Sequence, residues 1–344
     1  MTDRKEFLRR AGVGAAGLSA GGLLAPPAAL AGGGGGDFPD HPRWRFVFVS
    51  HSTLDPLLVA TQFGAQDAAA LVNCTTRWTG SPRGSAGETL KALRSAITSK
   101  ADGIAVSVFD TPAFAAQVET ARRARIPVVA FNVDTLAGGP RLAYVGEDPY
   151  ISGSRVGAEI ARLSAREAVA VLAPAGARAW VERRLEGILG GLSRTPRAAR
   201  ATVLRLQGDV KQQQSQIEKA LDNQPRLRGL YSVDQIGTTA AGTVIKERKL
   251  RARGFHGGGY DLLPDDLSLV ADGYLDFVVD QQPYVQGFVS VMQLFLARIS
   301  EHTVVPWDTE TSVLLRAADV KTFLATKSRF EGSSSRHEYP LRRG

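Results

Sequence analysis

The length and composition of the chain are those of an ordinary folded protein with room for two lobes. It has 344 residues, 42 Lys plus Arg against 34 Asp plus Glu, a net charge of +8, 44% hydrophobic residues and one Cys. Collagen-like, disordered and disulfide-stapled chains are excluded, because glycine has no regular period, charged residues are only 22% and one cysteine cannot form an intramolecular bridge. The basic residues are not interleaved with aromatic ones, so we expect no nucleic-acid partner.

The first 31 residues are predicted to be an export signal. Residues 4–10 are rich in Lys and Arg, residues 11–24 are apolar, and Ala29-Leu30-Ala31 is a small-residue cleavage motif. The apolar run is shorter than the roughly 20 residues of a membrane-spanning helix. The charged segment resembles a twin-arginine signal with Lys5 in place of the second arginine, which leaves the export route open. We therefore expect a protein of the periplasm or of the outer face of the cell envelope, with a Gly-rich linker at residues 32–43.

Short β-branched runs alternate with amphipathic helical patterns along the rest of the chain, and the predicted strands fall into two successive series. The first series comprises residues 44–50, 69–75, 103–108, 127–131 and 142–145, and the second comprises residues 168–173, 202–206, 229–233 and 267–270. Alternating strands and helices predict parallel sheets that are covered by helices on both faces. The expected fold class is therefore α/β, with two doubly wound parallel-sheet lobes.

Polar residues follow several of these strands, at the sheet edge where doubly wound folds bind their ligands. They include Ser52, Glu147, Asp148 and Gln235, and those that we assign to a ligand site are His51, Ser107, Asp110, Asn132, Asp134, Asp234 and Asp261. Carboxylates and amides are planar and can form two hydrogen bonds at once, which suits the adjacent hydroxyl groups of a polyol.

Several polar or small residues also have a purely structural interpretation. Asp55 and Asp110 each stand shortly before a proline and can cap a helix. His51 could serve local packing, and Cys74 fits a small core residue on the second predicted strand. Residues 257–259 are glycines, which we interpret as a loop and not as a dinucleotide-binding motif, because no helix is predicted to begin there.

Particular segments resemble the type I periplasmic binding proteins of sugar ABC transporters, the ribose-binding branch most of all. They are residues 129–134 (VAFNVD), 144–148 (YVGED), 259–261 (GYD) and 272–287 (DGYLDFVVDQQPYVQG). The last segment is the most specific, since it resembles the crossover segment of that branch closely. The resemblance covers about residues 44–325.

This resemblance implies two lobes joined by a three-strand hinge, with crossings near Asp148, Gln281 and Glu310. Each lobe is then discontinuous. The implied N-terminal lobe comprises residues 44–148 and 281–309, the C-terminal lobe comprises residues 149–280 and 310–330, and residues 331–344 form a polar tail.

Carried over by position, the resemblance implies ligand contacts from both lobes. Besides the strand-end residues above, it assigns Gln281 at the hinge, Trp180, and Glu182, which stands where the ribose branch has an arginine. Trp180 and Trp78 are the candidates for stacking on the face of a sugar.

The chain also departs from the ribose-binding pattern. Asn132 replaces an aspartate of the family, Val133 replaces the neighbouring arginine, and the aromatic ring expected near Val210 is missing. These differences argue against ribose itself as the ligand, though not against the fold.

The function implied by the resemblance is capture of a sugar or polyol between two lobes by hinge closure. The protein would deliver this ligand to the membrane permease of an ABC transporter, as a monomer and without a cofactor or metal. Two other classes of protein stay open, a secreted α/β enzyme and a ligand-sensing module of a regulator or receptor. An enzyme would need a nucleophile and a base in register. A ligand-sensing module of a regulator or receptor would need a DNA-binding head before residue 44 or a following membrane helix.

Overall fold

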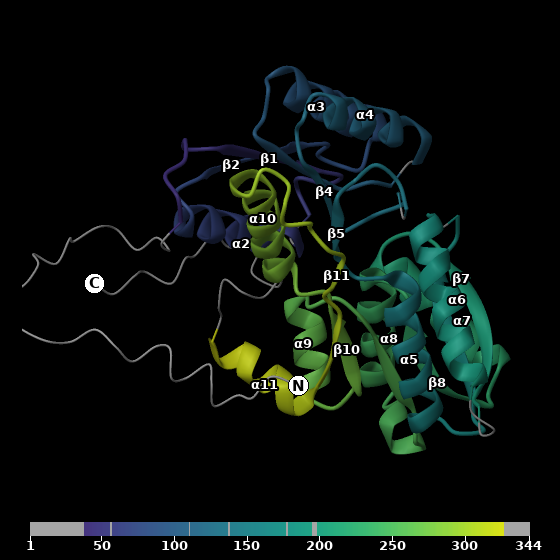
Figure 1. Ribbon diagram of the computed structural model, residues 1–344. Helices are drawn as coiled ribbons and strands as arrows, with labels where there is room; N and C mark the ends of the chain where they lie inside the picture. The colour runs from purple at the N-terminus through teal and green to yellow at the C-terminus, as the bar shows by residue number, and fades with distance from the viewer. Residues whose placement is uncertain are drawn as a thin grey trace, which may run out of the picture. The chain divides into compact units, whose positions relative to one another are not determined.

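The computed structural model describes residues 38–55, 57–109, 111–136, 138–176, 178–194 and 198–326. The predicted export signal, the Gly-rich start of the linker, the polar tail and Asp110 lie outside these residues. The described chain forms two six-stranded sheets, each with helices packed on both faces (Figure 1). This confirms the predicted α/β fold class. Across the described ranges, no helix is long and apolar enough to cross a lipid bilayer.

The N-terminal sheet has the strand order β11-β5-β4-β3-β1-β2, and its strand pairs are parallel. Its strands are β1 (Arg45–Ser50), β2 (Thr75–Gly80), β3 (Gly103–Val106), β4 (Val128–Phe131), β5 (Ala143–Gly146) and β11 (Thr309–Glu310). Its helices are α2 (Leu57–Leu71), α3 (Ala86–Thr98), α4 (Thr111–Arg123) and α10 (Pro283–Ile299). Because side chains alternate along a strand, Phe46 and Phe48 of β1 pack with α2 and α10, whereas Val47 and Val49 pack with α3 and α4.

The C-terminal sheet has the strand order β12-β10-β9-β8-β6-β7, in which β12 is antiparallel to β10 and the other pairs are parallel. Its strands are β6 (Ala168–Pro174), β7 (Arg200–Leu206), β8 (Leu227–Ser232), β9 (His256–Tyr260), β10 (Phe277–Asp280) and β12 (Val313–Arg316). Its helices are α5 (Pro149–Leu163), α6 (Ala179–Ser193), α7 (Val210–Asn223), α8 (Gln235–Glu247), α9 (Pro264–Ala271) and α11 (Ala317–Thr326), with the short 3₁₀ helix η1 (Leu250–Arg253).

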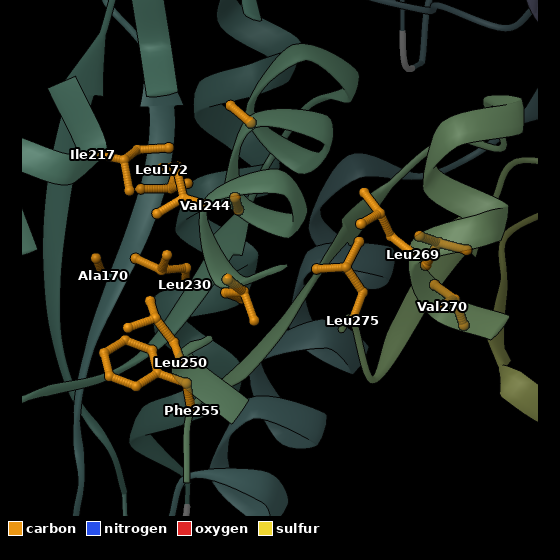
Figure 2. Packing of buried hydrophobic residues seen from close by; sticks show 14 of the residues in the cluster. Ala170, Leu172, Ile217, Leu230, Val244, Leu250, Phe255, Leu269, Val270 and Leu275 are labelled. Atoms are coloured by element: carbon orange, nitrogen blue, oxygen red, sulfur yellow. The ribbon is translucent and has the colours of Figure 1, made fainter. Parts of the chain in front are cut away.

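The core of this second lobe is built by the same alternation. Ala170 and Leu172 of β6 belong to a cluster with Ile217 of α7 and Val244 of α8 (Figure 2). The residues between them on β6 face α5 and α6 on the opposite side of the sheet. Both faces of the sheet are therefore buried, as the near-continuous apolar run of β6 predicts.

Two predicted strands are wrong. Residues 69–75 do not form a strand, because α2 continues to Leu71 and packs its alanines on the sheet at helical spacing. The true second strand, β2, is a half-buried edge strand with polar side chains and carries a weak hydrophobic signal. Residues 267–270 lie in α9, and the strands of this region are β9 and β10 instead.

The glycines at 257–259 form the centre of β9 and not a loop. A Cβ atom at Gly259 would lie 2.0 Å from Thr238 Oγ1, so α8 approaches the strand too closely for a larger residue. Since glycine is depleted in most strands, this close packing explains why the sequence pattern missed β9.

The chain passes between the two sheets three times. The passages lie at residues 147–148, between β5 and α5, at residues 281–282, between β10 and α10, and at residues 311–312, between β11 and β12. The passages are linked to one another, since the Thr311 hydroxyl donates to the backbone oxygen of Gln281 at 2.7 Å and the Asp148 backbone N–H donates to Glu310 at 2.5 Å.

Candidate functional site

A cavity of about 200 Å³ lies where the carboxyl ends of strands from both sheets meet the first two passages. Its N-terminal side is lined by His51, Asp55, Leu57, Asn132, Val133, Asp134, Tyr144 and Glu147. Its C-terminal side is lined by Pro149, Trp180, Arg184, Asp234, Gln235, Ile236 and Asp261, and Gln281 of the second passage completes it. Strand-end residues of two parallel sheets line this cavity, which is where doubly wound folds bind ligands.

Most of the side chains proposed from the sequence line this cavity. They are His51, Asn132, Asp134, Trp180, Asp234, Asp261 and Gln281. Ser107 is fully buried and is not among the lining residues. Glu182 is also absent from the lining, since its carboxylate pairs with Arg205 at 2.5 Å. Asp110 lies outside the described residues.

Asn132 and Asp261 occupy corresponding places in the two sheets. Each residue directly follows a strand and has a left-handed backbone, with φ of 62° at Asn132 and 76° at Asp261. Asn and Asp tolerate this conformation better than other non-glycine residues, and strained residues often cluster at ligand sites. Asp261 Oδ1 accepts a hydrogen bond from Gln281 Nε2 at 2.6 Å, and Asn132 Nδ2 donates to Gln286 Oε1 at 3.3 Å.

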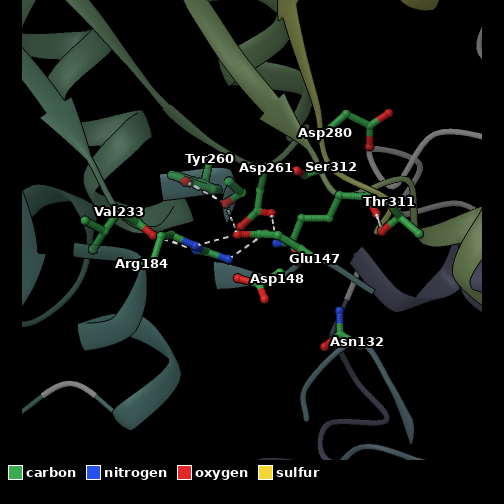
Figure 3. Close-up of polar contacts among 12 residues, drawn as sticks. Asn132, Glu147, Asp148, Arg184, Val233, Tyr260, Asp261, Asp280, Thr311 and Ser312 are labelled. Carbon is green, nitrogen blue, oxygen red and sulfur yellow. Dashed lines mark hydrogen bonds and ion pairs between the residues drawn. The ribbon is translucent and has the colours of Figure 1, made fainter. Parts of the chain in front are cut away.

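A buried ion pair forms one wall of the cavity (Figure 3). Arg184 donates to both carboxylate oxygens of Glu147, at 2.9 and 2.7 Å, and to the backbone oxygen of Val233 at 2.6 Å. Its guanidinium also lies 3.9 Å from the centre of the Tyr260 ring. Burial raises the pKa of Glu147 above its ordinary value, and the charge of Arg184 opposes this shift. Three of the five N–H groups of Arg184 are thus committed to Glu147 and Val233, so Arg184 holds this wall of the cavity in place.

The other carboxylates make the cavity strongly acidic. Burial raises the pKa of Asp55, Asp234 and Asp261 above the ordinary value of aspartate, in the last case to about 7. Asp234 accepts from the backbone N–H of Gly237 at 2.9 Å, so it caps α8 and lines the cavity at once. Burial also raises the pKa of Asp134, although Arg141 pairs with it at 2.6 Å and opposes this shift. A ligand that donates hydrogen bonds suits this lining, whereas an anion would be repelled.

Two nitrogens in the cavity wall have no partner. Nδ1 of His51 and Nε1 of Trp180 are buried and make no hydrogen bond within the described part of the chain. Burial, reinforced by the nearby charge of Arg178, lowers the pKa of His51 to about 4, so the ring is neutral at pH 7. A buried polar group without a partner costs about 1–3 kcal/mol, which a hydroxyl of a bound ligand would offset.

The two tryptophans proposed for stacking lie in different places. Trp180 lines the cavity. Trp78 lies within β2 and stacks on Phe48 with ring centres 5.7 Å apart, so it is part of the N-terminal sheet's packing. Cys74 is buried among the same apolar residues, as predicted, but it lies between α2 and β2 and not on a strand.

Arg184 is a cavity residue that the strand-end analysis missed. Arg184 stands in the buried stripe of α6 with Val181, Leu185 and Ile188. An arginine at such a position is itself a signal, because an isolated charge is not buried without a partner. Its partner could not be read from the sequence, since the close approach of α5 and α6 brings the two together: a Cβ atom at Gly153 would lie 2.2 Å from the Arg184 backbone oxygen.

Two doubly wound lobes that face one polar cavity are typical of bilobal small-molecule-binding proteins. The chain belongs to the periplasmic binding protein family: the family model described as "Periplasmic binding protein domain" matches residues 46–298. It is also 34% identical over 339 residues to the xylose/arabinose-binding protein XylF of Sulfolobus acidocaldarius, covering 94% of this chain and 82% of that relative. The resemblance seen in the sequence is therefore confirmed.

Solved structures show the same fold. A sugar-binding protein of a sugar ABC transporter from Bacillus halodurans matches with a TM-score of 0.74 at 19% identity, covering 81% of this chain and 99% of that chain. An ABC transporter solute-binding protein from Burkholderia graminis, in complex with D-arabinose, matches with a TM-score of 0.71 at 23% identity, covering 84% and 99%. Among the described residues, no group of three potential ligand side chains is placed to hold a metal ion.

Proposed function

We propose that the protein binds an uncharged monosaccharide or polyol in the cavity between its two sheets. The observation that carries this proposal is that one cavity combines the nitrogens of His51 and Trp180, which have no partner among the described residues, with the carboxylates of Asp234 and Asp261. A hydroxyl group can donate to a carboxylate and accept from an indole N–H, so a polyhydroxylated ligand meets both needs. An anionic ligand meets neither the charge nor the donor requirement.

The named relatives support the same class of ligand. XylF carries the name xylose/arabinose-binding protein, and the solved structures with this fold include complexes with D-arabinose and with myo-inositol. We infer that a pentose, a hexose or a cyclic polyol is the ligand, and that Ser107 and Glu182 contribute less to binding than the residues that line the cavity.

The protein's place in the cell is also part of the proposal. We propose that it is exported, that it works as a monomer, and that it delivers its ligand to the membrane permease of an ABC transporter. The family description, the relatives' names and the signal-like first 31 residues support this. A binding role without catalysis is part of the proposal, because the family model and the named relatives describe binding proteins.

Isothermal titration calorimetry of the purified protein tests the proposal. We expect one site for at least one of D-xylose, L-arabinose, D-glucose, D-ribose and myo-inositol, and no heat with D-glucuronate. At ~100 times its dissociation constant, that ligand should add about 2.7 kcal/mol to the free energy of unfolding. The absence of binding heat with every one of the five uncharged ligands would contradict the proposal.

A further inference from the structure

Gln286 lies behind the cavity and touches residues from both of its sides. It stands in the first turn of α10, it is fully buried, and it is not among the residues that line the cavity. Its Oε1 accepts from Asn132 Nδ2 at 3.3 Å, and its Nε2 donates to the backbone oxygen of Gln281 at 2.8 Å. A longer contact of 3.4 Å joins Nε2 to Thr311 Oγ1 at the third passage.

These bonds continue to the other side of the cavity. Gln281 Nε2 donates to Asp261 Oδ1 at 2.6 Å. Three hydrogen bonds therefore link Asn132 at the end of β4 to Asp261 at the end of β9, by way of Gln286 and of Gln281, which bonds to Gln286 through its backbone oxygen and to Asp261 through its side chain.

The direction of each bond in this series is fixed by groups that have only one role. A backbone oxygen can only accept, so Gln286 must present its NH₂ group to Gln281, and its own oxygen then faces Asn132. Asn132 therefore donates to this oxygen through its NH₂ group, so its Oδ1 lies on the other side of its amide. This assignment rests on the network and not on the ambiguous appearance of an amide group.

We propose that Gln286 is a positioning residue that orients Asn132 as a hydrogen-bond acceptor for the ligand and, through Gln281, holds Asp261 in place. The inference rests on the proposed function, since it takes the cavity as the sugar site. It also gives a role to the asparagine in this chain. Held in this orientation, Asn132 offers an acceptor oxygen to a ligand hydroxyl without adding a further negative charge to a cavity that already contains several carboxylates.

Helix α10 supplies a matched control. Gln293 lies seven positions after Gln286 on the same helix, is 1% exposed, and bonds through Nε2 to the Trp307 backbone oxygen at 2.8 Å and to Thr309 Oγ1 at 3.2 Å. It is not among the lining residues. Gln286→Met and Gln293→Met remove the same groups from the same helix, so both should lower the unfolding midpoint similarly.

Affinity for D-xylose and L-arabinose should separate the two variants. We expect Gln286→Met to weaken binding by about 2- to 10-fold, the fold-change of losing one neutral hydrogen bond, and Gln293→Met to leave it unchanged. If Gln286→Met fails to fold, Thr311→Val provides the second test, because it removes the hydroxyl that also donates to the Gln281 backbone oxygen. Equal affinities for wild type and these variants would overturn the proposal.

A measurement on the ligand-free protein tests the role of Gln286 independently of sugar binding. The bond from Gln281 and the charge of Arg184 lower the pKa of Asp261, while burial and the carboxylates of Glu147 and Asp55 raise it. Loosening Gln281 should therefore raise the Asp261 pKa in Gln286→Met and not in Gln293→Met, as read by carbon NMR of the Asp261 carboxyl group. If wild type binds neither sugar, the proposed function fails for these ligands, but an unchanged Asp261 pKa in Gln286→Met would still overturn the role of Gln286.

Discussion

Arg184 of α6 holds Glu147 of the first passage in a two-point ion pair whose side chains are only 3% and 1% exposed. The hydroxyl of Ser152 also donates to Glu147, and the Tyr144 hydroxyl donates to its backbone oxygen at 2.8 Å. The pair therefore fixes the point at which the chain leaves the N-terminal sheet, directly beside the proposed ligand. Its geometry supports the first prediction.

Arg184→Met should lower the free energy of unfolding by about 3–5 kcal/mol, because it leaves the buried Glu147 carboxylate without its partner. The neighbouring Arg183→Met should lower it by less than about 1 kcal/mol, since Arg183 pairs with Glu186 at the surface. Urea unfolding of both variants measures the difference. The double variant Glu147→Leu, Arg184→Met should recover much of the loss, and a mild effect of Arg184→Met alone would contradict the account of the pair.

The raised pKa of Asp261 predicts how stability depends on pH. In the unfolded chain an aspartate titrates near ~3.9, whereas burial raises the Asp261 pKa to about 7 in the fold. The folded state then binds more protons than the unfolded state between these values, so this group lowers stability as pH rises from about 4 to about 7. Asp261→Asn removes that contribution.

We therefore expect Asp261→Asn to gain stability relative to wild type as the pH rises. The difference in free energy of unfolding, variant minus wild type, should be larger and more positive at pH 8 than at pH 5. Urea unfolding at the two pH values gives the comparison. Burial raises the pKa of Asp266 to about 8 and the charge of Asp261 adds to that rise, so the loss of this charge in Asp261→Asn changes stability in the same direction. A difference that does not change with pH, or that changes in the opposite sense, would show that Asp261 is ionised well below pH 7.

Arg178 makes a contact between the two sides of the site that is separate from the three passages. It precedes α6, its Nη2 donates to the Gly84 backbone oxygen at 3.3 Å, and its guanidinium lies 5.1 Å from the centre of the Phe109 ring. A cation–π contact at an exposed position is worth about 0.5–1 kcal/mol, so Arg178→Ala should weaken sugar binding by about 2- to 5-fold, mainly through faster dissociation. Stopped-flow measurements test this, with Arg205→Ala as the control on the same lobe. Equal dissociation rates would mean that Arg178 does not stabilise the bound form.

Closure about the passages is expected when ligand binds. A ligand shifts the equilibrium between open and closed forms only if it contacts both lobes, and the cavity offers Asn132 on one side and Asp261 on the other. Small-angle X-ray scattering at saturating sugar should show a smaller radius of gyration than without sugar. An unchanged radius at saturation would argue against hinge closure even if binding were proven.

The sequence predicted those parts of the fold and site that depend on local pattern. Buried strands such as β1 and β6 were found because their side chains are apolar without interruption, and Asn132 and Asp261 were found because they directly follow strands. What it could not predict depends on contacts between distant segments. The strand β9 needs glycine because of Thr238, and the partner of Arg184 is set by the packing of α5 on α6.

The different surroundings of Glu182 and Arg184 could not be predicted from position alone. The resemblance assigned a ligand contact to Glu182, but its carboxylate pairs with Arg205 of β7, while Arg184 in the buried stripe of α6 lines the cavity. A shift of two residues on a helix changes the side that a residue faces by about 200°.

Calorimetry of Asp261→Ala tests the central claim most directly. At pH 8, where Asp261 is ionised, wild type should bind D-xylose or L-arabinose, and Asp261→Ala should bind about 10- to 150-fold more weakly, the range for losing a charge-assisted hydrogen bond of about 1.5–3 kcal/mol. The exposed neighbour Asp265→Ala should bind like wild type. Wild-type affinity in Asp261→Ala would contradict the account, because the carboxylate that faces the cavity would then make no contact with the sugar.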